Sequence, residues 1–529
     1  MPKLTIDGRV IEVAEGTNLI EAARSAGVAI PYFCYHPYLS VVGQCRICLV
    51  EIEGQPRLAI ACATPAADGM VVRSETSERV RQARNAVMEF LLANHPLDCP
   101  VCDQAGECLL QDHSFDQGLD TTHMIETRRT FPGLERRRLG PHIVQNQNRC
   151  IHCSRCIRFT QEISETAQLT YKTRGNRAYI DTHDGSPFDD PMSGCAADVC
   201  PVGALTVKEF RFRKRSWKLR STPSVCPGCS IGCNVWIDHH ERVAYRLNPR
   251  ENAAINATWM CDYGRFLAES LNHHEILHPQ RHTDGRLQPV DWPVALAGVK
   301  EVLDGSSSLR VVASANLSNE ELHLAKALLG GARRADIVVP VWSGEKRRMK
   351  NGAGTWLQSH DAHPNAAGAR RLGLRLVDQK GLVHFLYGAA DVTVILDPLA
   401  HPFLETDEAI QLLRVGTAVV FARLEHPLTR LASWLLPTPS LACNEGTFTS
   451  STGAVQRFAA AFAPPGQSRP LWLTLTALAR EMEVEDLVLA SPAEIFAHMV
   501  RTERGFAGLE WKALAGTTDL SQRERHHGG

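Results

Sequence analysis

The spacing of apolar and polar positions predicts short elements along the first half of the chain. Residues 4–13 alternate around Asp7 and Gly8, which predicts a β-hairpin with a primed turn. Helical periodicity follows at residues 18–26, and Gly27 suits the C-cap of that helix. Further elements are predicted as a helix at residues 77–94 and strands at residues 48–53, 57–61, 204–207, 234–239 and 242–247.

From about residue 289 onward, apolar runs alternate with helical segments. The predicted strands lie at residues 309–314, 335–340, 391–397 and 417–422, and the predicted helices at residues 318–329 and 405–413. Ser318 and Glu321 have the spacing of a capping box at a helix start. Strands separated by helices predict a parallel α/β sheet. The polar tail at residues 521–529 is expected to be frayed.

Composition excludes several classes of function. The net charge is −1, so neither nucleic-acid binding nor attraction to an anionic membrane surface is indicated. The first residues lack the apolar stretch of a signal peptide, and no apolar run approaches the roughly 18 residues of a membrane span. We therefore expect a cytoplasmic protein that is soluble or peripheral to a membrane. The sequence also contains neither G-x-G-x-x-G nor a Walker A motif, so it offers no nucleotide cradle.

The cysteines are distributed very unevenly. Sixteen of the seventeen lie between Cys34 and Cys261, and only Cys443 lies beyond. In a reducing compartment such clustering indicates metal ligands rather than disulfides.

The first group is Cys34, Cys45, Cys48 and Cys62, spaced C-x10-C-x2-C-x13-C. It falls among a hairpin, a helix and further strands, which together predict a β-grasp ferredoxin. Plant-type [2Fe–2S] ferredoxins have the pattern C-x4-C-x2-C followed by a distant cysteine, and only the first gap is longer here. The group predicts a [2Fe–2S] cluster, with zinc as the alternative.

The second group follows the helix predicted at residues 77–94. Cys99, Cys102 and Cys108 supply three thiolates and need a fourth ligand for a [4Fe–4S] cluster. No spare cysteine is near, whereas His95 lies at the helix end, four residues before Cys99. We predict that His95 is the fourth ligand; the alternative is an ordinary helix-end histidine.

The third group has the spacing of a bacterial ferredoxin. Cys150, Cys153 and Cys156 follow C-x2-C-x2-C, and Cys200 precedes a proline. A second copy of the motif is missing, so one [4Fe–4S] cluster is predicted, with zinc as the alternative. Cys195 could compete with Cys200 as the fourth ligand, but we interpret it as a small buried residue.

The fourth group is Cys226, Cys229, Cys233 and Cys261, and it predicts a third [4Fe–4S] site with structural zinc as the alternative. Glycines between these cysteines let the backbone approach the sulfurs closely. The four groups use fifteen cysteines and His95, leaving only Cys195 and Cys443. No acid–base pair or nucleophile stands out, so we expect one-electron transfer and no catalytic residue.

With these residues the chain resembles the 75-kDa iron–sulfur subunit family of respiratory complex I, which in the bacterial NADH-quinone oxidoreductase is the subunit designated G. The order and spacing of the four groups carry the resemblance, and residues 444–448 and 453–456 look like the late motif of that family. It implies a 2Fe-2S ferredoxin-type domain at residues 1–78, a His/Cys3 4Fe-4S domain at 79–118, a 4Fe-4S ferredoxin-like region at 119–215, a 4Fe-4S domain of the Mo/W-oxidoreductase type at 216–275 and a reduced molybdopterin-oxidoreductase-like α/β domain at 276–529.

The resemblance also implies a function. A flavin- and NADH-binding subunit would pass single electrons to the first, third and second groups in that order, and another cluster subunit would carry them toward quinone. The fourth group would lie off this path. The implied location is the cytoplasmic side of the inner membrane, among the peripheral-arm subunits of complex I, with no direct membrane span and no nucleic acid.

Two departures from that family matter. The chain is shorter than typical members, and its C-terminal α/β region looks trimmed. In molybdenum relatives a lysine commonly follows the closing cysteine of the last cluster, whereas Asp262 follows Cys261 here. No cysteine lies between Cys261 and Cys443, so we expect no molybdenum or pterin.

Two other interpretations remain open from the sequence. One is the electron-transfer (diaphorase) part of a soluble NAD-linked hydrogenase or formate dehydrogenase, which shares the first three groups. The other is a scaffold that is held together by zinc and has no redox role.

Overall fold

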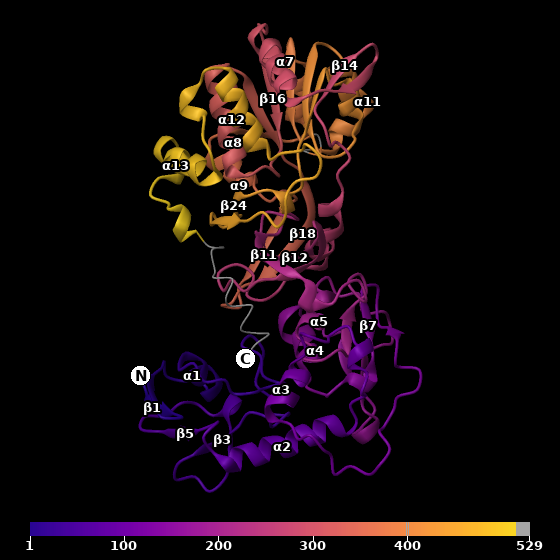
Figure 1. The fold of residues 1–529 in the computed structure, drawn as a ribbon, viewed down its shortest axis with the longest axis vertical. Coiled ribbons are helices and arrows are strands. Elements are labelled where there is room, and N and C mark those ends of the chain that lie inside the picture. Colours follow the sequence, from indigo (N-terminus) through magenta and orange to yellow (C-terminus); the bar gives the residue numbers. More distant parts are fainter. Residues whose placement is uncertain (398, 400, 515–529) are drawn as a thin grey trace. The chain divides into compact units, whose positions relative to one another are not determined.

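The computed structural model describes residues 1–397, 399 and 401–514, and the tail predicted to fray at residues 521–529 lies outside them. The described chain divides into two compact units (Figure 1). We call Met1–Leu219 the first unit and the part that begins at Arg220 the second unit. The predicted fold class is confirmed, because several small sheets precede one large α/β sheet.

The first unit opens with a five-stranded sheet in the order β2-β1-β5-β3-β4. Its elements are β1 (Lys3–Ile6), β2 (Arg9–Glu12), α1 (Leu19–Ser25), β3 (Leu49–Ile52), β4 (Ala59–Ile60) and β5 (Val71–Arg73). Asp7 and Gly8 have φ of 43° and 81°, so the predicted primed turn is present. Asn18 caps α1 by accepting from the backbone N–H of Ile20 and Glu21. The sequence did not reveal β5, which pairs in parallel with β1 and completes the β-grasp sheet.

The rest of the first unit is built from short elements around loops. They are α2 (Glu78–Ala93), α3 (Leu109–Gln117), β6 (Arg137–Arg138), β7 (Ile143–Gln145), α4 (Arg155–Arg158), β8 (Leu169–Lys172), β9 (Tyr179–Thr182), α5 (Ser193–Asp198) and β10 (Leu205–Val207). Strands β10, β7 and β6 form one small sheet, and β8 and β9 form a hairpin. The predicted helix at residues 77–94 matches α2, which Ser77 caps.

The second unit begins with an antiparallel three-stranded sheet. Its strands are β11 (Arg220–Val225), β12 (Asn234–His240) and β13 (Val243–Pro249), and the short helix α6 (Asp262–Arg265) follows. The predicted strand pair at residues 234–239 and 242–247 is therefore present.

The large sheet of the second unit has eight strands in the order β15-β14-β23-β22-β21-β16-β17-β20. They are β14 (Gln280–Thr283), β15 (Arg286–Pro289), β16 (Leu309–Ala313), β17 (Asp336–Pro340), β20 (Arg375–Val377), β21 (Val392–Leu396), β22 (Thr417–Ala422) and β23 (Trp434–Pro437). The six strands β16, β17, β20, β21, β22 and β23 pair in parallel as predicted, and β14 and β15 add an antiparallel hairpin at one edge.

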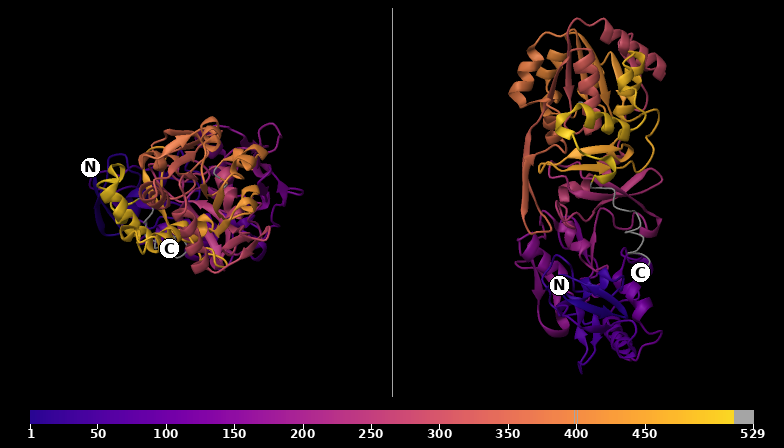
Figure 2. Two further views of the ribbon diagram at one scale, coloured as in Figure 1. Left: turned by 90° about the horizontal axis from the view of Figure 1, so that it is seen from above. Right: turned by 90° about the vertical axis from the view of Figure 1, so that its left-hand side faces the viewer.

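Helices cover both faces of this sheet (Figure 2). They are α7 (Trp292–Asp304), α8 (Asn319–Ala325), α9 (Ala366–Arg371), α10 (Gln379–Tyr387), α11 (Asp407–Leu413), α12 (Leu471–Glu481) and α13 (Pro492–Thr502). Successive strand residues point to opposite faces, so Val311 packs with α7, α8 and α12, whereas Val312 packs with α10 and α11. Burial on both faces explains why these strands are continuous apolar runs.

Two predicted helices differ from the structure at their ends. Ser318 and Glu321 form the predicted capping box of α8, but the α-helix ends at Ala325 and continues as a π-helical segment, Lys326–Ala332. Helix α11 begins at Asp407 under a Thr406 cap, because Glu405 belongs to the preceding 3-10 turn, Pro402–Glu405.

Two hairpins extend beyond these layers. One is β18 (Ser343–Lys350) with β19 (Trp356–Asp361), and the other is β24 (Gly446–Thr449) with β25 (Val455–Phe458). Figures 1 and 2 show the first hairpin reaching away from the large sheet. No helix among the described residues combines the length and apolarity that a bilayer crossing requires.

Candidate iron–sulfur cluster sites

The four thiols of the first group come from the long connection between α1 and β3 and from the 3-10 turn Ala61–Ala63 after β4, and they form two hydrogen-bonded pairs. Cys34 pairs with Cys45, and Cys48 pairs with Cys62. The hydrogen bond from Cys45 lowers the pKa of Cys34 to about 5, while the bond to Cys62 together with burial raises the pKa of Cys48. Two pairs of thiols are a suitable ligand set for a [2Fe–2S] cluster, in which each iron takes two cysteines.

The third group surrounds one small apolar cavity. Its walls include all four cysteines, with Ile151, Ile180, Val202, Ala204 and Leu205. His152 and Ser154 have φ of 55° and 59°, and this left-handed backbone folds the loop between the cysteines tightly. The backbone N–H of His152 donates to Cys150 Sγ over 3.4 Å, an interaction that favours a charged sulfur. Burial opposes it and raises the pKa of Cys150 to about 12.

Cys195 and Cys200 occupy different surroundings. Cys200 lines the cavity of the third group, whereas Cys195 is fully buried in α5 and is not among the residues described as lining it. This placement favours Cys200 as the fourth ligand.

The second group lies beside the loop that carries Cys200. Cys108 Sγ lies 3.8 Å from the carbonyl oxygen of Pro201. A Cβ on Gly203 would lie 2.3 Å from Cys102 Sγ, so a residue with a side chain could not occupy this position without displacing the sulfur. Cys102 and Cys108 are buried, whereas Cys99 is exposed.

His95 lies directly after the Asn94 cap of α2, as the sequence predicts. Burial lowers the pKa of His95 to about 4, so its imidazole is neutral at pH 7, the form that binds metals. Asp98 and Arg149 form an ion pair. The charges of this pair influence the pKa of His95 and that of Cys102, so His95 and Cys102 lie in the same neighbourhood. Ligation by His95 stays a prediction.

The fourth group also surrounds a cavity. Its cysteines line it together with Tyr263, Gly264, Met349 and Arg347. The loop between β11 and β12 carries three of them and is closed by a 2.8 Å hydrogen bond from Cys226 N to Cys233 O. A Cβ on Gly264 would lie 2.6 Å from Cys226 Sγ, so glycine is needed there. Burial raises the pKa of Cys226, and that of Cys229 to about 11.

These donor sets fit iron–sulfur clusters chemically. Two groups of four thiols each face a shared cavity, and glycines let the backbone pass close to the sulfurs. Within the part of the chain that the structure describes, no three His, Cys, Asp or Glu side chains are grouped closely enough to hold a single metal ion. The leftover Cys443 is buried in a 3-10 turn of the second unit.

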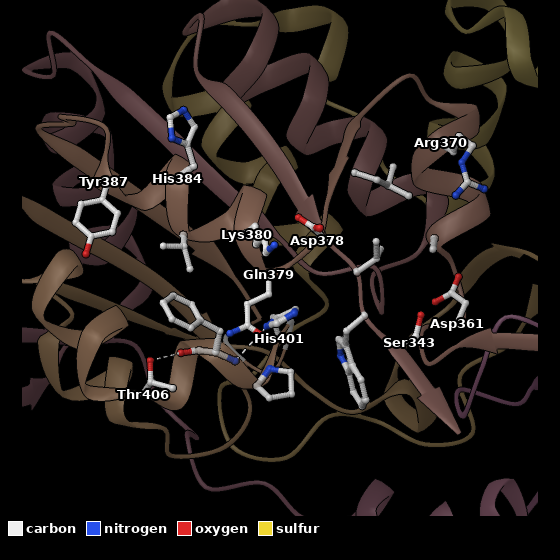
Figure 3. Close-up of a pocket in the computed structure, with 17 residues that line it drawn as sticks. Ser343, Asp361, Arg370, Asp378, Gln379, Lys380, His384, Tyr387, His401 and Thr406 are labelled. Atoms are coloured by element: carbon white, nitrogen blue, oxygen red, sulfur yellow. Dashed lines mark hydrogen bonds between the residues drawn. The ribbon is translucent and has the colours of Figure 1, made fainter. Parts of the chain in front are cut away.

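The sequence did not reveal a large pocket in the second unit (Figure 3). It encloses about 1310 Å³ near the carboxyl ends of β17 and β20, where α/β sheets commonly bind ligands. Charges of both signs line it, among them Arg370, Lys380, Asp361 and Asp378. These residues come from the end of β19, the last turn of α9 and the start of α10 and belong to no motif, so no sequence signal marks them.

The comparisons with known proteins follow the order of the four groups. Residues 2–77 match the 2Fe-2S iron-sulfur cluster binding domain, and residues 84–123 match the NADH-ubiquinone oxidoreductase-G iron-sulfur binding region. Residues 140–206 match the ferredoxin-like domain of NADH-quinone oxidoreductase subunit 3, and residues 219–273 match the molybdopterin oxidoreductase Fe4S4 domain. Fold and sites therefore define a multidomain iron–sulfur protein.

The relatives give a narrower assignment. The chain is 39% identical over 334 residues to the subunit designated G of the Rickettsia typhi NADH-quinone oxidoreductase, covering 62% of this chain and 48% of that protein. It is 41% identical over 299 residues to the mitochondrial 78 kDa subunit of NADH-ubiquinone oxidoreductase from Neurospora crassa, covering 56% of this chain and 40% of that protein. The chain is thus a homologue of these subunits of NADH-quinone and NADH-ubiquinone oxidoreductases, and the predicted resemblance is confirmed.

The chain spans about half the length or less of these curated relatives. Among solved structures, a chain of an NAD+-reducing [NiFe]-hydrogenase in the H2-reduced state is 31% identical, with a TM-score of 0.36, over 41% of this chain and 91% of that one.

Proposed function

We propose that the chain is the iron–sulfur electron-transfer subunit of an NADH-quinone oxidoreductase, relaying single electrons from an NADH- and flavin-binding subunit toward quinone in a proton-pumping respiratory complex. The first group would hold one [2Fe–2S] cluster and each other group one [4Fe–4S] cluster, without molybdenum or pterin. Such clusters supply one-electron transfer when bound. The similarity to the Rickettsia typhi subunit supports this proposal.

The observation that carries the proposal is the physical contact between three ligand groups in the first unit. The Arg158 guanidinium donates to the carbonyl oxygens of Cys34, over 2.6 Å, and Cys153, over 3.3 Å. It therefore joins a ligand of the first group to a ligand of the third. Gln44 makes a parallel link by donating to the His152 carbonyl oxygen over 2.7 Å.

The third group contacts the second group on its other side. Residues 200–203 carry the Cys200 thiol and also pass against Cys102 and Cys108. Cys45, Cys150, Cys200 and Cys108 all pack in one apolar cluster with Phe33, Ile47 and Met88. The third group thus contacts both the first and the second, which supports the order first, third, second implied by the family resemblance.

The chain's own residues supply insulation and positive charge for such a relay. The apolar side chains around Phe33 exclude water between the groups. Arg155 and Arg158, each 5% exposed, place permanent positive charge near Cys153. The arginine charges favour a reduced, more negative site, and the low dielectric constant of the apolar surroundings strengthens that attraction, although burial itself disfavours added charge.

Metal analysis separates this proposal from a zinc scaffold. Anaerobically reconstituted full chain should hold about fourteen irons with matching acid-labile sulfide, which is the sum for one [2Fe–2S] and three [4Fe–4S] clusters. Stoichiometric zinc with little sulfide would contradict it.

The experiment that tests the assembly is affinity purification of the tagged chain from detergent-solubilised membranes. We propose a peripheral location on the cytoplasmic side of the inner membrane, so a flavin subunit, further peripheral-arm subunits and membrane subunits should copurify. Copurification of a nickel- or molybdenum-containing subunit without membrane subunits would instead indicate the diaphorase of a soluble NAD-linked enzyme.

A further inference from the structure

A positive charge approaches the fourth group from a distant part of the chain. Arg347, on β18, lines the same cavity as the four thiols. Its guanidinium carbon lies 3.5 Å from the centre of the Tyr263 ring, a cation–π contact. Tyr263 follows Cys261 by two residues and lines the cavity too. A stacked arginine is thereby fixed beside the sulfurs.

The hairpin that carries Arg347 is anchored to the loop of the fourth group. Ser359 and Ser230 share a hydrogen bond of 2.6 Å between their hydroxyls, and Ser230 N donates to Asp361 O over 3.3 Å. Met349 lies two residues after Arg347, on the same face of β18, and is 1% exposed in the cavity wall. These contacts hold the position of Arg347 from both strands of the hairpin.

The positive charge of Arg347 would affect the reduction potential of a cluster held by the fourth group. One-electron reduction adds one negative charge to a site that already carries four thiolates, and no bond is made or broken. A neighbouring guanidinium, which stays protonated in proteins, stabilises the reduced state more than the oxidised state. It therefore raises the reduction potential. In the same direction, Arg347 lowers the pKa of Cys226, Cys229 and Cys261, although burial raises the pKa of each overall.

We propose that Arg347 sets the reduction potential of the cluster held by the fourth group, with Tyr263 as the residue that positions its guanidinium. The inference rests on the proposed function, because it requires a cluster at these four cysteines. The position after Cys261 carries Asp262 and no cation, so the positive charge comes from the hairpin.

The test is an EPR-monitored redox titration of the reconstituted full chain. The signal of the fourth group is identified by its loss in Cys229→Ser. We expect Arg347→Gln to lower the ratio of reduced to oxidised cluster about tenfold at fixed ambient potential, equivalent to about 59 mV for one electron. Arg347→Lys keeps the charge, so its midpoint potential should stay close to that of the unsubstituted chain. Tyr263→Leu should lower the midpoint potential as Arg347→Gln does, but by a smaller amount.

Lys350→Gln is the matched control, because it removes the same charge from the same hairpin. Lys350 stacks on Trp356 and is not among the residues described as lining the cavity. Equal midpoints in Arg347→Gln and Lys350→Gln would overturn the inference. If Arg347→Gln fails to assemble the cluster, an unchanged midpoint in Tyr263→Leu would overturn it instead. Absence of any Cys229-dependent signal in the unsubstituted chain would contradict the proposed function itself.

Discussion

In the first unit three predicted ligand groups contact one another, whereas the second unit holds a single group, with three cysteines in the loop between β11 and β12 and Cys261 just before α6. The core of the first unit includes ligand residues: Cys48 and Cys62 pack with Leu19 and Val50, and Cys108 packs with Phe33. The two cores that cover the large sheet are made of aliphatic and aromatic side chains, and as far as the structure describes them they contain no ligand cysteine. We therefore expect folding and metal binding to be coupled in the first unit and largely separate in the second.

Metal removal should give the largest difference between the units. We expect chelation under denaturant-free conditions to make residues 1–219 sensitive to protease, because their small cores lose the bonds that hold the cysteine loops together. The large sheet of the second unit should stay protected. Limited proteolysis with peptide mass mapping measures both. Equal protection of the two units after metal loss would show that the first unit folds without its clusters.

The next largest effect is expected at the third group. Cys200→Ser should abolish the EPR signal of the central cluster and stop electron flow from NADH to quinone, because it removes a ligand at the group that lies between the other two. Cys195→Ser is the matched control in α5 and should leave both nearly unchanged, since Cys195 is not among the residues described as lining the cavity. The reverse pattern would identify Cys195 as the ligand.

Substitution of Arg158 tests the contact between the first and the third group, and its expected effect is smaller than that of Cys200→Ser. Arg158→Gln removes hydrogen bonds to the Cys34 and Cys153 carbonyls, so we expect electron transfer from the first to the third group to slow by about tenfold, corresponding to about 1.4 kcal/mol of barrier. Rapid-mixing absorbance on the purified complex measures the rate. Arg174→Gln, at an exposed position of the first unit, is the control. An unchanged rate in Arg158→Gln would show that the Arg158 side chain does not contribute to electron transfer between the first and the third group.

The smallest expected effect is a change in how the stability of the second unit depends on pH. Glu320 is fully buried and accepts hydrogen bonds from Thr447 N and Oγ1. Burial raises its pKa from 4.5 to about 8. The folded chain thus keeps a proton that the unfolded carboxyl releases near its ordinary pKa. The resulting stabilisation is complete below pH 4.5 and is lost as pH rises through 8.

From pH 6 to pH 8 this loss should amount to about 2 kcal/mol of unfolding free energy. Glu320→Gln should flatten the pH slope of the unfolding transition that is insensitive to metal removal, as followed by chemical denaturation. Glu485→Gln, at an exposed position of the same unit, should leave the slope unchanged. A steep slope that persists in Glu320→Gln would assign the effect to another group.

The sequence by itself determined the local features of this protein. Cysteines separated by two or three residues share a loop, so the centre of each predicted ligand group could be written down from spacing alone. The turn at Asp7 and Gly8 and the capping box at Ser318 likewise depend on neighbouring residues, and both are present. The parallel α/β sheet followed from the alternation of apolar runs and helices.

Only the tertiary structure decided which distant segments meet. It inserted β5 between β1 and β3, and it brought Arg158 to Cys34 and Arg347 to Tyr263. The hairpin that carries Arg347 shows no clear alternation, because much of β18 is exposed and hydrogen bonds and ring stacking hold the hairpin in place. Such contacts depend on the packing of whole elements, in which each short stretch has many possible partners, and no local spacing of residues encodes the choice.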